Sequence, residues 1–289
     1  MKQQRREFLK WSGGLAIGTA LAPITGKWVT EEETDSRIKT FGLQLYSVRD
    51  DMPKDPKGIL KQIASFGYKQ VESYEGPTGM FWGMSNIDFK KTMDDLDMTI
   101  VSSHCDITKD FEKKTGEAAA IGMKYLIYNW PSGHEKMDEY KKKADMFNKC
   151  GETCRKAGMH FANHNYDQSF IPIGGEIPMD VLMKNTDPSL VDYQMDIYWV
   201  VMGGADPIKW LKKYPNRFRL CHIKDRIKGA TERDASCNLG TGSIDFSPIL
   251  KTAKQNGMQY YIAEQERYDG TTPLKAVEAD AEYMRSLKI

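Results

Sequence analysis

The chain has 289 residues, 40% of them hydrophobic, and its 41 basic and 40 acidic side chains leave a formal net charge of +1. This length supports a sizeable core and fits one α/β-barrel domain, with two small domains as the alternative. The near-neutral balance gives no general electrostatic reason to bind nucleic acid or an anionic membrane, and the odd number of cysteines, five, argues against a disulfide framework.

Residues 1–36 are interpreted as an export signal and a linker. The pair Arg5-Arg6 is followed by Phe8 and then by a weakly apolar, Gly/Ala-rich run over 11–22, an order that resembles a twin-arginine signal. The run is too short and too glycine-rich for a stable membrane span. We therefore expect an exported, periplasmic protein, with a disordered basic tail as the alternative reading of this segment.

From residue 37 onward, strand patterns and helix patterns alternate along the chain. Period-two and short apolar runs predict strands at 40–48, 68–72, 98–104, 124–128, 159–164, 191–195, 217–223 and 259–264. Amphipathic patterns, several with proline in the first turn or glycine after the last, predict helices at 56–66, 86–96, 109–121, 137–157, 179–185, 207–213, 246–256 and 273–287. Eight such units predict a single (β/α)8 TIM barrel over residues 37–289. The first strand is not followed by Gly-x-Gly-x-x-Gly, which disfavours a dinucleotide-binding fold.

Ionisable side chains gather where the predicted strands end. They are Glu72, His104, His164, Asp196, His222 with Lys224, and Glu264 with Glu266. In a barrel these positions meet at one mouth, although each one alone could be a hydrogen-bonded structural group. Two imidazoles and two carboxylates, from His164, Asp196, His222 and Glu264, make a mixed donor set that suits Mn, Co, Ni, Zn or Fe better than a Ca or Mg cage.

Seven short motifs in a fixed order carry a resemblance to a known family. They are NHNYD at 163–167, MDIYWV at 195–200, GADP at 204–207, KYPNR at 213–217, HIKD at 222–225, LGTGSIDF at 239–246 and YIAEQ at 261–265. Together they resemble the xylose-isomerase-like TIM-barrel family of sugar phosphate isomerases and epimerases. The resemblance implies one divalent metal ion (Mn, Co, Ni, Zn or Mg) held at the ends of strands five to eight, here by His164, Asp196, His222 and Glu264.

The residue at position 164 departs from the commonest pattern of that family. Many members have glutamate there, whereas this chain has His164 in a setting similar to a His-Asn-His variant. Imidazole can replace carboxylate as a ligand, so the metal site is retained. The family's epimerases use two metal-bound carboxylates, one on each face of the substrate. His164 cannot act as the first of these bases, which disfavours symmetric two-base epimerisation.

The resemblance implies a sugar isomerase or epimerase that removes a proton next to a carbonyl. The metal would act as a Lewis acid and stabilise the enediolate. Glu264, or Glu72 across the mouth, is the candidate general base. His104 would hydrogen-bond a substrate oxygen or relay a proton, and Lys224 would stabilise the oxyanion, with a structural role as the alternative for both.

The expected partner is a small-molecule carbohydrate, and the oligomeric state is left open. Trp130, Trp199, Asn165 and Glu266 are the candidate substrate contacts, with core packing as the alternative for the tryptophans. Export, and the lack of an evident phosphate-binding glycine loop, favour one alternative: a lyase that carries out β-elimination on a 3-keto-glycoside. A second alternative is an inactive exported barrel that only binds carbohydrate.

Overall fold

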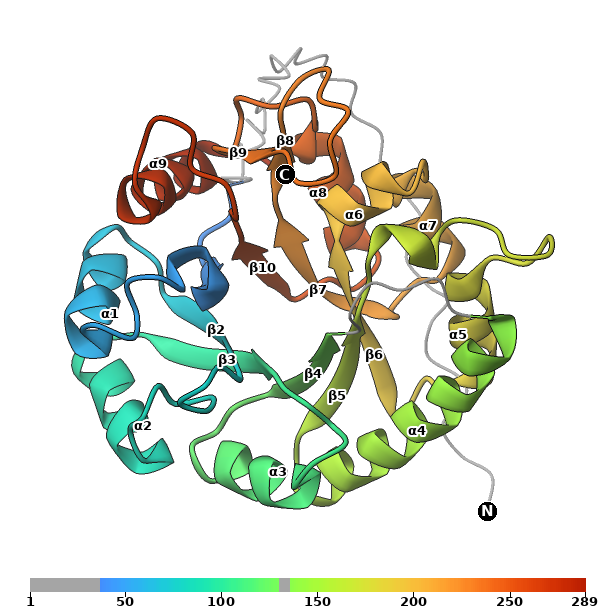
Figure 1. Ribbon diagram of the computed structural model, residues 1–289, viewed down its shortest axis with the longest axis horizontal. Helices are drawn as coiled ribbons and strands as arrows, with labels where there is room; N and C mark the ends of the chain where they lie inside the picture. Colours follow the sequence, from blue (N-terminus) through green and yellow to red (C-terminus); the bar gives the residue numbers. More distant parts are fainter. Residues whose placement is uncertain (1–36, 130–135) are drawn as a thin grey trace, which may run out of the picture. The chain divides into compact units, whose positions relative to one another are not determined.

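The computed structural model describes residues 37–129 and 136–289. Eight parallel strands form a closed barrel in the order β1-β10-β7-β6-β5-β4-β3-β2, and the helices lie in a ring outside them (Figure 1). The predicted TIM barrel is therefore confirmed. The expected export signal lies outside the described residues and stays a prediction. Within the described part of the chain, no helix is long and apolar enough to cross a membrane.

The observed elements follow the predicted alternation. The barrel strands are β1 Gly42–Gln44, β2 Gln70–Tyr74, β3 Thr99–His104, β4 Tyr125–Asn129, β5 His160–His164, β6 Val191–Asp196, β7 Phe218–Ile223 and β10 Tyr260–Ala263. The helices that return the chain are α1 Pro56–Ser65, α2 Asn86–Asp95, α3 Phe111–Ala120, α4 Met137–Lys156, α5 Pro178–Asn185, α7 Pro207–Lys213, α8 Phe246–Gln255 and α9 Pro273–Ser286. All five cysteines are free, as expected.

The first predicted strand is wrong in its second half. The chain leaves the barrel after Gln44 and forms a 3-10 helix, η1, over Leu45–Val48. The side chain of Gln44 accepts a hydrogen bond from the backbone N–H of Tyr46 at 3.1 Å, which caps the turn. The alternation of apolar residues continues through the turn, so the pattern alone could not show where the strand ends.

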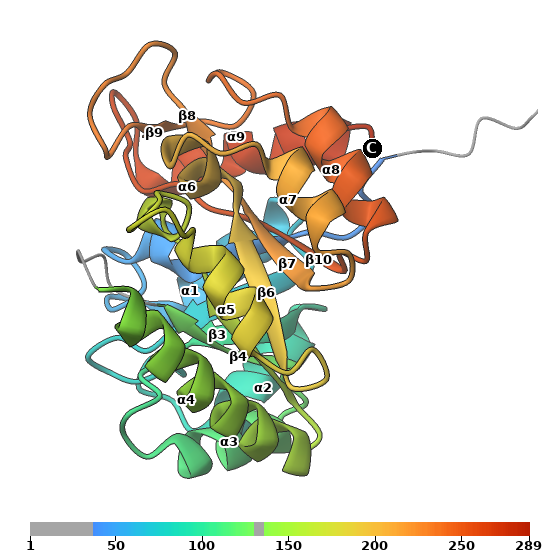
Figure 2. The ribbon, with the colours of Figure 1, turned by 90° about the vertical axis from the view of Figure 1, so that its right-hand side faces the viewer.

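Three short elements that were not predicted lie at the carboxyl end of the barrel. The helix α6, Ile197–Met202, begins directly after β6, and the strands β8 Asp225–Arg226 and β9 Ser236–Cys237 form a small antiparallel hairpin. Figure 2 shows α6 and this hairpin at the end of the barrel where β6 ends. These elements cover part of the mouth and bring further side chains to it.

The inside of the barrel changes from apolar to polar along its axis. Near the amino ends of the strands, the interior is filled by Val101, Tyr125, Ile127, Ala162 and Leu220. Above that layer, polar side chains are fully buried, namely Gln44, Glu72, Ser102, Gln194 and His222. Strand pairing places Asp196 beside His222 and Gln44 beside Glu72. Buried polar groups are tolerated when they are hydrogen-bonded or bind an ion, so this layer needs partners.

Candidate metal centre and active-site cleft

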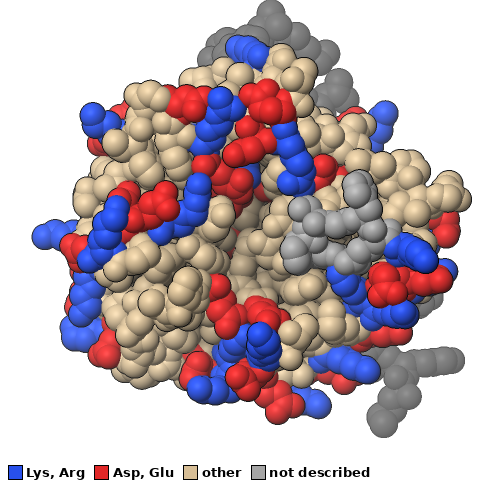
Figure 3. All heavy atoms as spheres, in the orientation of Figure 1, with Lys and Arg blue, Asp and Glu red and all other residues tan. Residues whose placement is uncertain are grey.

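A cleft of about 930 Å³ opens at the carboxyl end of the barrel. Predicted site residues His104, His164 and Glu264 line it, together with a set of aromatic side chains from Tyr46, Tyr74, Tyr128, Tyr166 and Trp199. Figure 3 shows the hollow at the centre of this face, with charged side chains around it. The cleft lies on the face where TIM barrels form active sites.

The four side chains predicted as metal ligands converge beside the cleft. His164 Nε2 lies 3.5 Å from Asp196 Oδ2, and His222 Nδ1 lies 3.6 Å from the same oxygen. Glu264 Oε2 lies 3.1 Å from His222 Nδ1. The four residues come from the ends of β5, β6 and β7 and from just after β10. We call this set the quartet.

The quartet presents ligand atoms that lack hydrogen bonds. His164 Nε2, Asp196 Oδ2 and His222 Nδ1 are all buried and have no hydrogen-bond partner of good geometry, and these three atoms lie within 4.8 Å of one another. Buried polar atoms without partners are uncommon and unfavourable unless they bind a ligand or ion. Two imidazole nitrogens with carboxylate oxygens suit Zn, Mn, Co or Ni. The quartet therefore fits a divalent transition-metal ion.

Each ligand side chain is held by its own element. Asp196 Oδ1 accepts a hydrogen bond from the backbone N–H of Trp199 at 3.2 Å and so caps α6, which leaves Oδ2 for the quartet. Asn165, predicted as a substrate contact, is fully buried and does not line the cleft. Its amide instead donates to the Asp196 carbonyl at 3.1 Å and accepts from the Asp196 N–H at 3.2 Å. Asn165 thus fixes the position of Asp196.

The position expected for Glu72 is wrong, because this residue does not lie across the mouth. It is fully buried below the quartet and does not line the cleft. Five side chains surround its carboxylate: Gln44 (2.7 Å), Ser102 (2.6 Å), Gln194 (2.7 Å), His222 (2.5 Å) and His104 (3.1 Å). Burial opposes ionisation, but the imidazoles of His104 and His222 outweigh it and hold the pKa of Glu72 well below its usual range.

This environment gives Glu72 a positioning role. Its Oε1 contacts His222 Nε2, so the proton of a neutral His222 belongs on Nε2, and Nδ1 faces the quartet with its lone pair. A carboxylate that holds the far nitrogen of a metal-binding histidine fixes the ring and raises its basicity as a ligand. Glu72 therefore supports the metal centre from beneath, and Glu264 is the carboxylate that faces the cleft.

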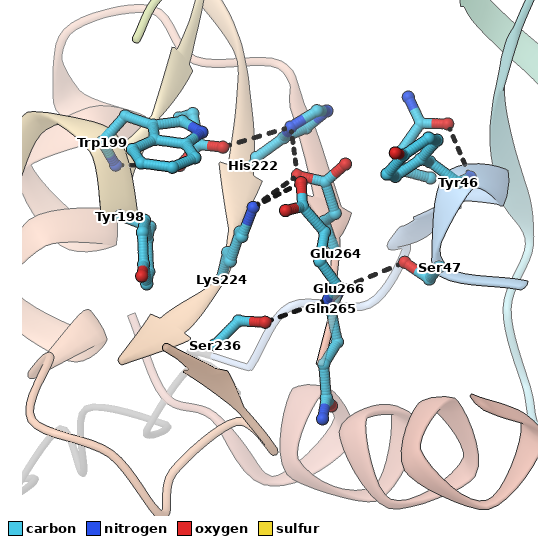
Figure 4. A network of polar contacts seen from close by, with 12 residues as sticks. Tyr46, Ser47, Tyr198, Trp199, His222, Lys224, Ser236, Glu264, Gln265 and Glu266 are labelled. Carbon is cyan, nitrogen blue, oxygen red and sulfur yellow. Dashed lines mark hydrogen bonds and ion pairs between the residues drawn. The ribbon is translucent and has the colours of Figure 1, made fainter. Parts of the chain in front are cut away.

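Lys224 lies behind the carboxylates rather than in the cleft. Its ammonium is buried, 2.6 Å from Glu266 Oε1 and 3.6 Å from Glu264 Oε2. It also lies over the ring of Trp199, at 5.0 Å from the centroid (Figure 4). Burial opposes the charge, yet the two carboxylates raise the pKa of Lys224, so the ammonium stays protonated. Glu266 and Trp199 both line the cleft, and their contact with substrate stays a prediction.

The remaining predicted residues are His104 and Trp130. His104 lines the cleft, and its Nε2 contacts Gln194 Oε1 at 2.8 Å. Its ring stacks on His222, with centroids 5.5 Å apart. Trp130 lies outside the described residues, so its expected contact stays a prediction.

The structure adds residues that the sequence reasoning missed. Gln44 and Gln194 are polar residues at inward-facing positions of buried strands, and this mismatch was a usable signal. Tyr166 lies within the 163–167 motif but was given no role, and its ring lies 5.0 Å from that of His164. No sequence pattern pointed to Arg233, because it lies in the loop between β8 and β9. Its guanidinium carbon lies 4.3 Å from the centroid of the Trp199 ring.

Metal binding is expected to release one proton and to weaken at low pH. Burial would lower the pKa of His222, but Glu264 and Glu72 outweigh it and raise the pKa well above its usual value. The metal-free protein therefore holds a proton on His222 that the ion must displace, whereas burial lowers the pKa of His164 to about 4 and leaves it neutral. Below the raised pKa, affinity should fall by about tenfold per pH unit. Calorimetric titration with Zn or Mn in buffers of different ionisation enthalpy measures the proton count. A metal affinity that does not change between pH 5 and 7 would contradict the expected release of a proton from His222.

The fold and the quartet define a TIM-barrel enzyme whose reactive face is the carboxyl end of the strands. A family model described as xylose isomerase-like TIM barrel matches residues 60–287, and the chain belongs to this family. An inosose dehydratase of Clostridium perfringens (strain ATCC 13124) is 32% identical over 271 residues, which cover 86% of each protein.

Solved structures agree with this assignment. One of a sugar phosphate isomerase/epimerase from Parabacteroides distasonis ATCC 8503 is 29% identical, has a TM-score of 0.75, and covers 86% of this chain and 94% of that one. The structure of the IOLI protein with a zinc atom bound shares the fold, with a TM-score of 0.69 at 15% identity, over 84% of this chain and 95% of that one.

Proposed function

We propose that this chain is a metal-dependent lyase that removes a β-substituent from a polyhydroxy ketone after taking a proton from the carbon next to the carbonyl. One observation carries the proposal. Glu264 is the one carboxylate of the quartet that also lines the cleft, because Asp196 is fully buried and position 164 is an imidazole. A site with one such carboxylate is suited to a single proton abstraction.

The state of Glu264 supports its role as the base. Burial disfavours its charge, but His222 and Lys224 outweigh this and lower the pKa of Glu264 to about 2. The carboxylate is therefore ionised at neutral pH and can accept a proton. A divalent ion bound by the quartet would supply Lewis-acid polarisation of the ketone. His104 also lines the cleft, where its ring can contact a substrate hydroxyl.

The elimination balances without an external reactant. The C–H bond next to the ketone breaks, and Glu264 takes the proton. Its electron pair forms the carbon–carbon double bond, while the substituent on the next carbon leaves with its own bonding pair and takes a proton from water. The similarity to inosose dehydratase supports this outcome, because that name denotes loss of water from an inosose, which is a cyclic polyhydroxy ketone.

An isomerase is the second candidate. The relative named sugar phosphate isomerase/epimerase favours it, and isomerisation uses the same first step. The two-base epimerase is less favoured, since His164 stands where the first of its two metal-bound carboxylates would be needed. Product analysis separates elimination, which gives an unsaturated ketone, from isomerisation, which gives a saturated product of unchanged mass.

Metal removal is expected to abolish proton exchange. Protein loaded with Mn, Co or Zn should exchange the hydrogen next to the carbonyl of an inosose or keto-glycoside in heavy water, followed by NMR, and should then eliminate the β-substituent. Treatment with a chelator should lower both rates by more than about a hundredfold, because the polarising cation is lost. Re-addition of the ion is the control. Exchange that survives chelation would contradict a metal-dependent enzyme, and sugar binding with no exchange would favour an inactive carbohydrate-binding barrel.

A further inference from the structure

The cleft has more room than one reacting ring requires. Its volume of about 930 Å³ lies near the upper end of the range for drug-sized ligands, whereas a six-membered cyclic polyol has only about a dozen non-hydrogen atoms. Figure 4 shows aromatic side chains on both sides of Glu264, with Trp199 on one side and Tyr46 on the other. Of the quartet, His164 and Glu264 line the cleft, so the side near Tyr46 is left to contact another part of the ligand.

Tyr46 forms an exposed but immobilised aromatic surface. Its side chain lines the cleft and is 38% exposed, which makes it the one large aromatic residue among the exposed hydrophobics of the described chain. Its ring packs edge-on against Tyr74 with centroids 5.2 Å apart, and Tyr74 packs likewise against Trp82 at 5.1 Å. We call Tyr46 and Tyr74 the tyrosine platform.

Hydrogen bonds hold the platform in place. Arg49 lies over the Tyr46 ring at 4.6 Å and donates to the Tyr46 carbonyl at 3.1 Å. The same guanidinium donates to the Glu266 carbonyl at 3.0 Å, which ties η1 to the loop after β10. A rigid aromatic side chain loses little entropy when a ring packs on it, so the platform is preorganised for a flat or ring-shaped group.

The charges around the cleft favour an uncharged ligand. Among the described residues, its lining includes five carboxylates, from Glu75, Asp106, Asp234, Glu264 and Glu266, and two cationic side chains, Lys109 and Arg233. Arg233 is already paired with Asp167 at 2.8 Å and stacked on Trp199. Lys114 pairs with Glu75, and Lys224 pairs with Glu264 and Glu266, so these nearby cations are also engaged by carboxylates and offer little attraction to an anionic ligand.

The loop where TIM barrels often bind phosphate is occupied by the protein's own carboxylates. Such sites use backbone N–H groups after strands seven and eight. Here Asp225 accepts from the N–H groups of Gly240 (3.0 Å), Gly242 (2.9 Å) and Ile244 (3.1 Å), and Asp280 accepts from that of Leu239 (2.8 Å). A Cβ added at Gly242 would lie 2.2 Å from Asp225 Oδ1, so the loop is closed tightly on this carboxylate.

We propose that the substrate is an uncharged glycoside whose aglycone or second ring packs on the tyrosine platform while its keto ring lies at the quartet. The placement of the keto ring at the quartet rests on the proposed function, whereas packing of the aglycone on the tyrosine platform does not. For a 3-keto ring, Glu264 would take the proton from C2, the C2–C1 double bond would form, and the C1–O bond would break. The aglycone would leave with the bonding pair and be protonated by water, which gives an enone and an alcohol.

The test measures binding without turnover. Methyl and phenyl glycosides of glucose, galactose and mannose, which lack the ketone and cannot react, are titrated calorimetrically into metal-loaded protein. The phenyl compounds should bind about tenfold more tightly than the methyl compounds of the same sugar, because only they reach the platform. Tyr46→Ala should remove this preference and Tyr46→Trp should retain it. Ile87→Ala, at an exposed α2 position that does not line the cleft, is the matched control and should change nothing.

Three results would overturn the proposal: equal affinity of wild-type protein for methyl and phenyl compounds, a phenyl preference that survives in Tyr46→Ala, or binding of none of the phenyl glycosides. Tighter binding of glucose 6-phosphate than of methyl glucoside would also overturn it. The outcome is independent of the exchange experiment. Tyr46-dependent binding without metal-dependent exchange would refute the proposed function alone, and exchange without Tyr46-dependent binding would refute the platform alone.

Discussion

Replacing Glu264 with glutamine is expected to lower the rate of proton exchange by about 10²- to 10⁴-fold, the usual contribution of a general base. Glutamine has nearly the same shape and still offers an oxygen to the quartet, but its amide cannot accept the proton. The pKa of Glu264 is about 2, so its carboxylate is ionised at neutral pH and has a free position for the proton. The measurement is the NMR exchange rate in heavy water at saturating metal.

Glu264 also belongs to the quartet, so loss of metal must be separated from loss of the base. Metal content by atomic absorption should be determined on the same samples, and the rate compared at equal occupancy. Asp234→Asn is the matched control, because Asp234 lines the same cleft and lies outside the quartet. A Glu264→Gln variant that keeps near-full exchange at full metal occupancy would rule out Glu264 as the base. Glu72 could not replace it, since it does not reach the cleft.

The convergence of the quartet was predictable for a simple physical reason. In a parallel barrel all strands end at one face, so the residue that ends each strand is placed by the count of strands alone. That is why His164, Asp196, His222 and Glu264 could be assigned to one site without knowledge of any distance. The structure confirms that they meet.

Depth along the barrel axis was not predictable in the same way. Strand β2 was expected to end at Glu72, but it continues to Tyr74. Because side chains alternate with a period of two, Glu72 keeps its inward direction but lies one layer lower, among Gln44, Ser102 and Gln194. An error of two residues in a strand boundary thus changed a candidate base into a buried support for His222.

Two short helices that directly follow barrel strands, η1 and α6, escaped prediction. Tyr46 lies in a turn closed by the Gln44 side chain, and Trp199 lies in α6, which is capped by Asp196. In both cases the polar residue that ends the strand, Gln44 or Asp196, is part of the polar cluster of the site and also caps the helix that follows. Alternation of apolar residues does not report such caps, and after β1 the pattern extends the predicted strand past its true end.

Replacing Glu72 with glutamine is expected to weaken metal binding by about 10- to 100-fold, the usual effect of removing a carboxylate that supports a ligating histidine. The amide accepts fewer hydrogen bonds than the carboxylate that Gln44, Ser102, Gln194 and His222 now share. If its NH₂ faces His222 Nε2, the ring proton moves to Nδ1, and that atom can no longer bind the ion. The affinity is measured by competition with a chelating dye for Zn or Co.

The control for Glu72→Gln is Glu75→Gln. Glu75 follows β2, lines the cleft, and pairs with Lys114 at 2.7 Å without touching the quartet. Its replacement should leave metal affinity within about twofold, since a partly exposed ion pair contributes little to a site it does not contact. Equal losses in both variants would indicate a general electrostatic effect of removing negative charge from the cleft. A loss confined to Glu72→Gln, with circular dichroism unchanged, would show that the metal centre depends on a residue that never touches the ion, because the orientation of His222 is set from beneath.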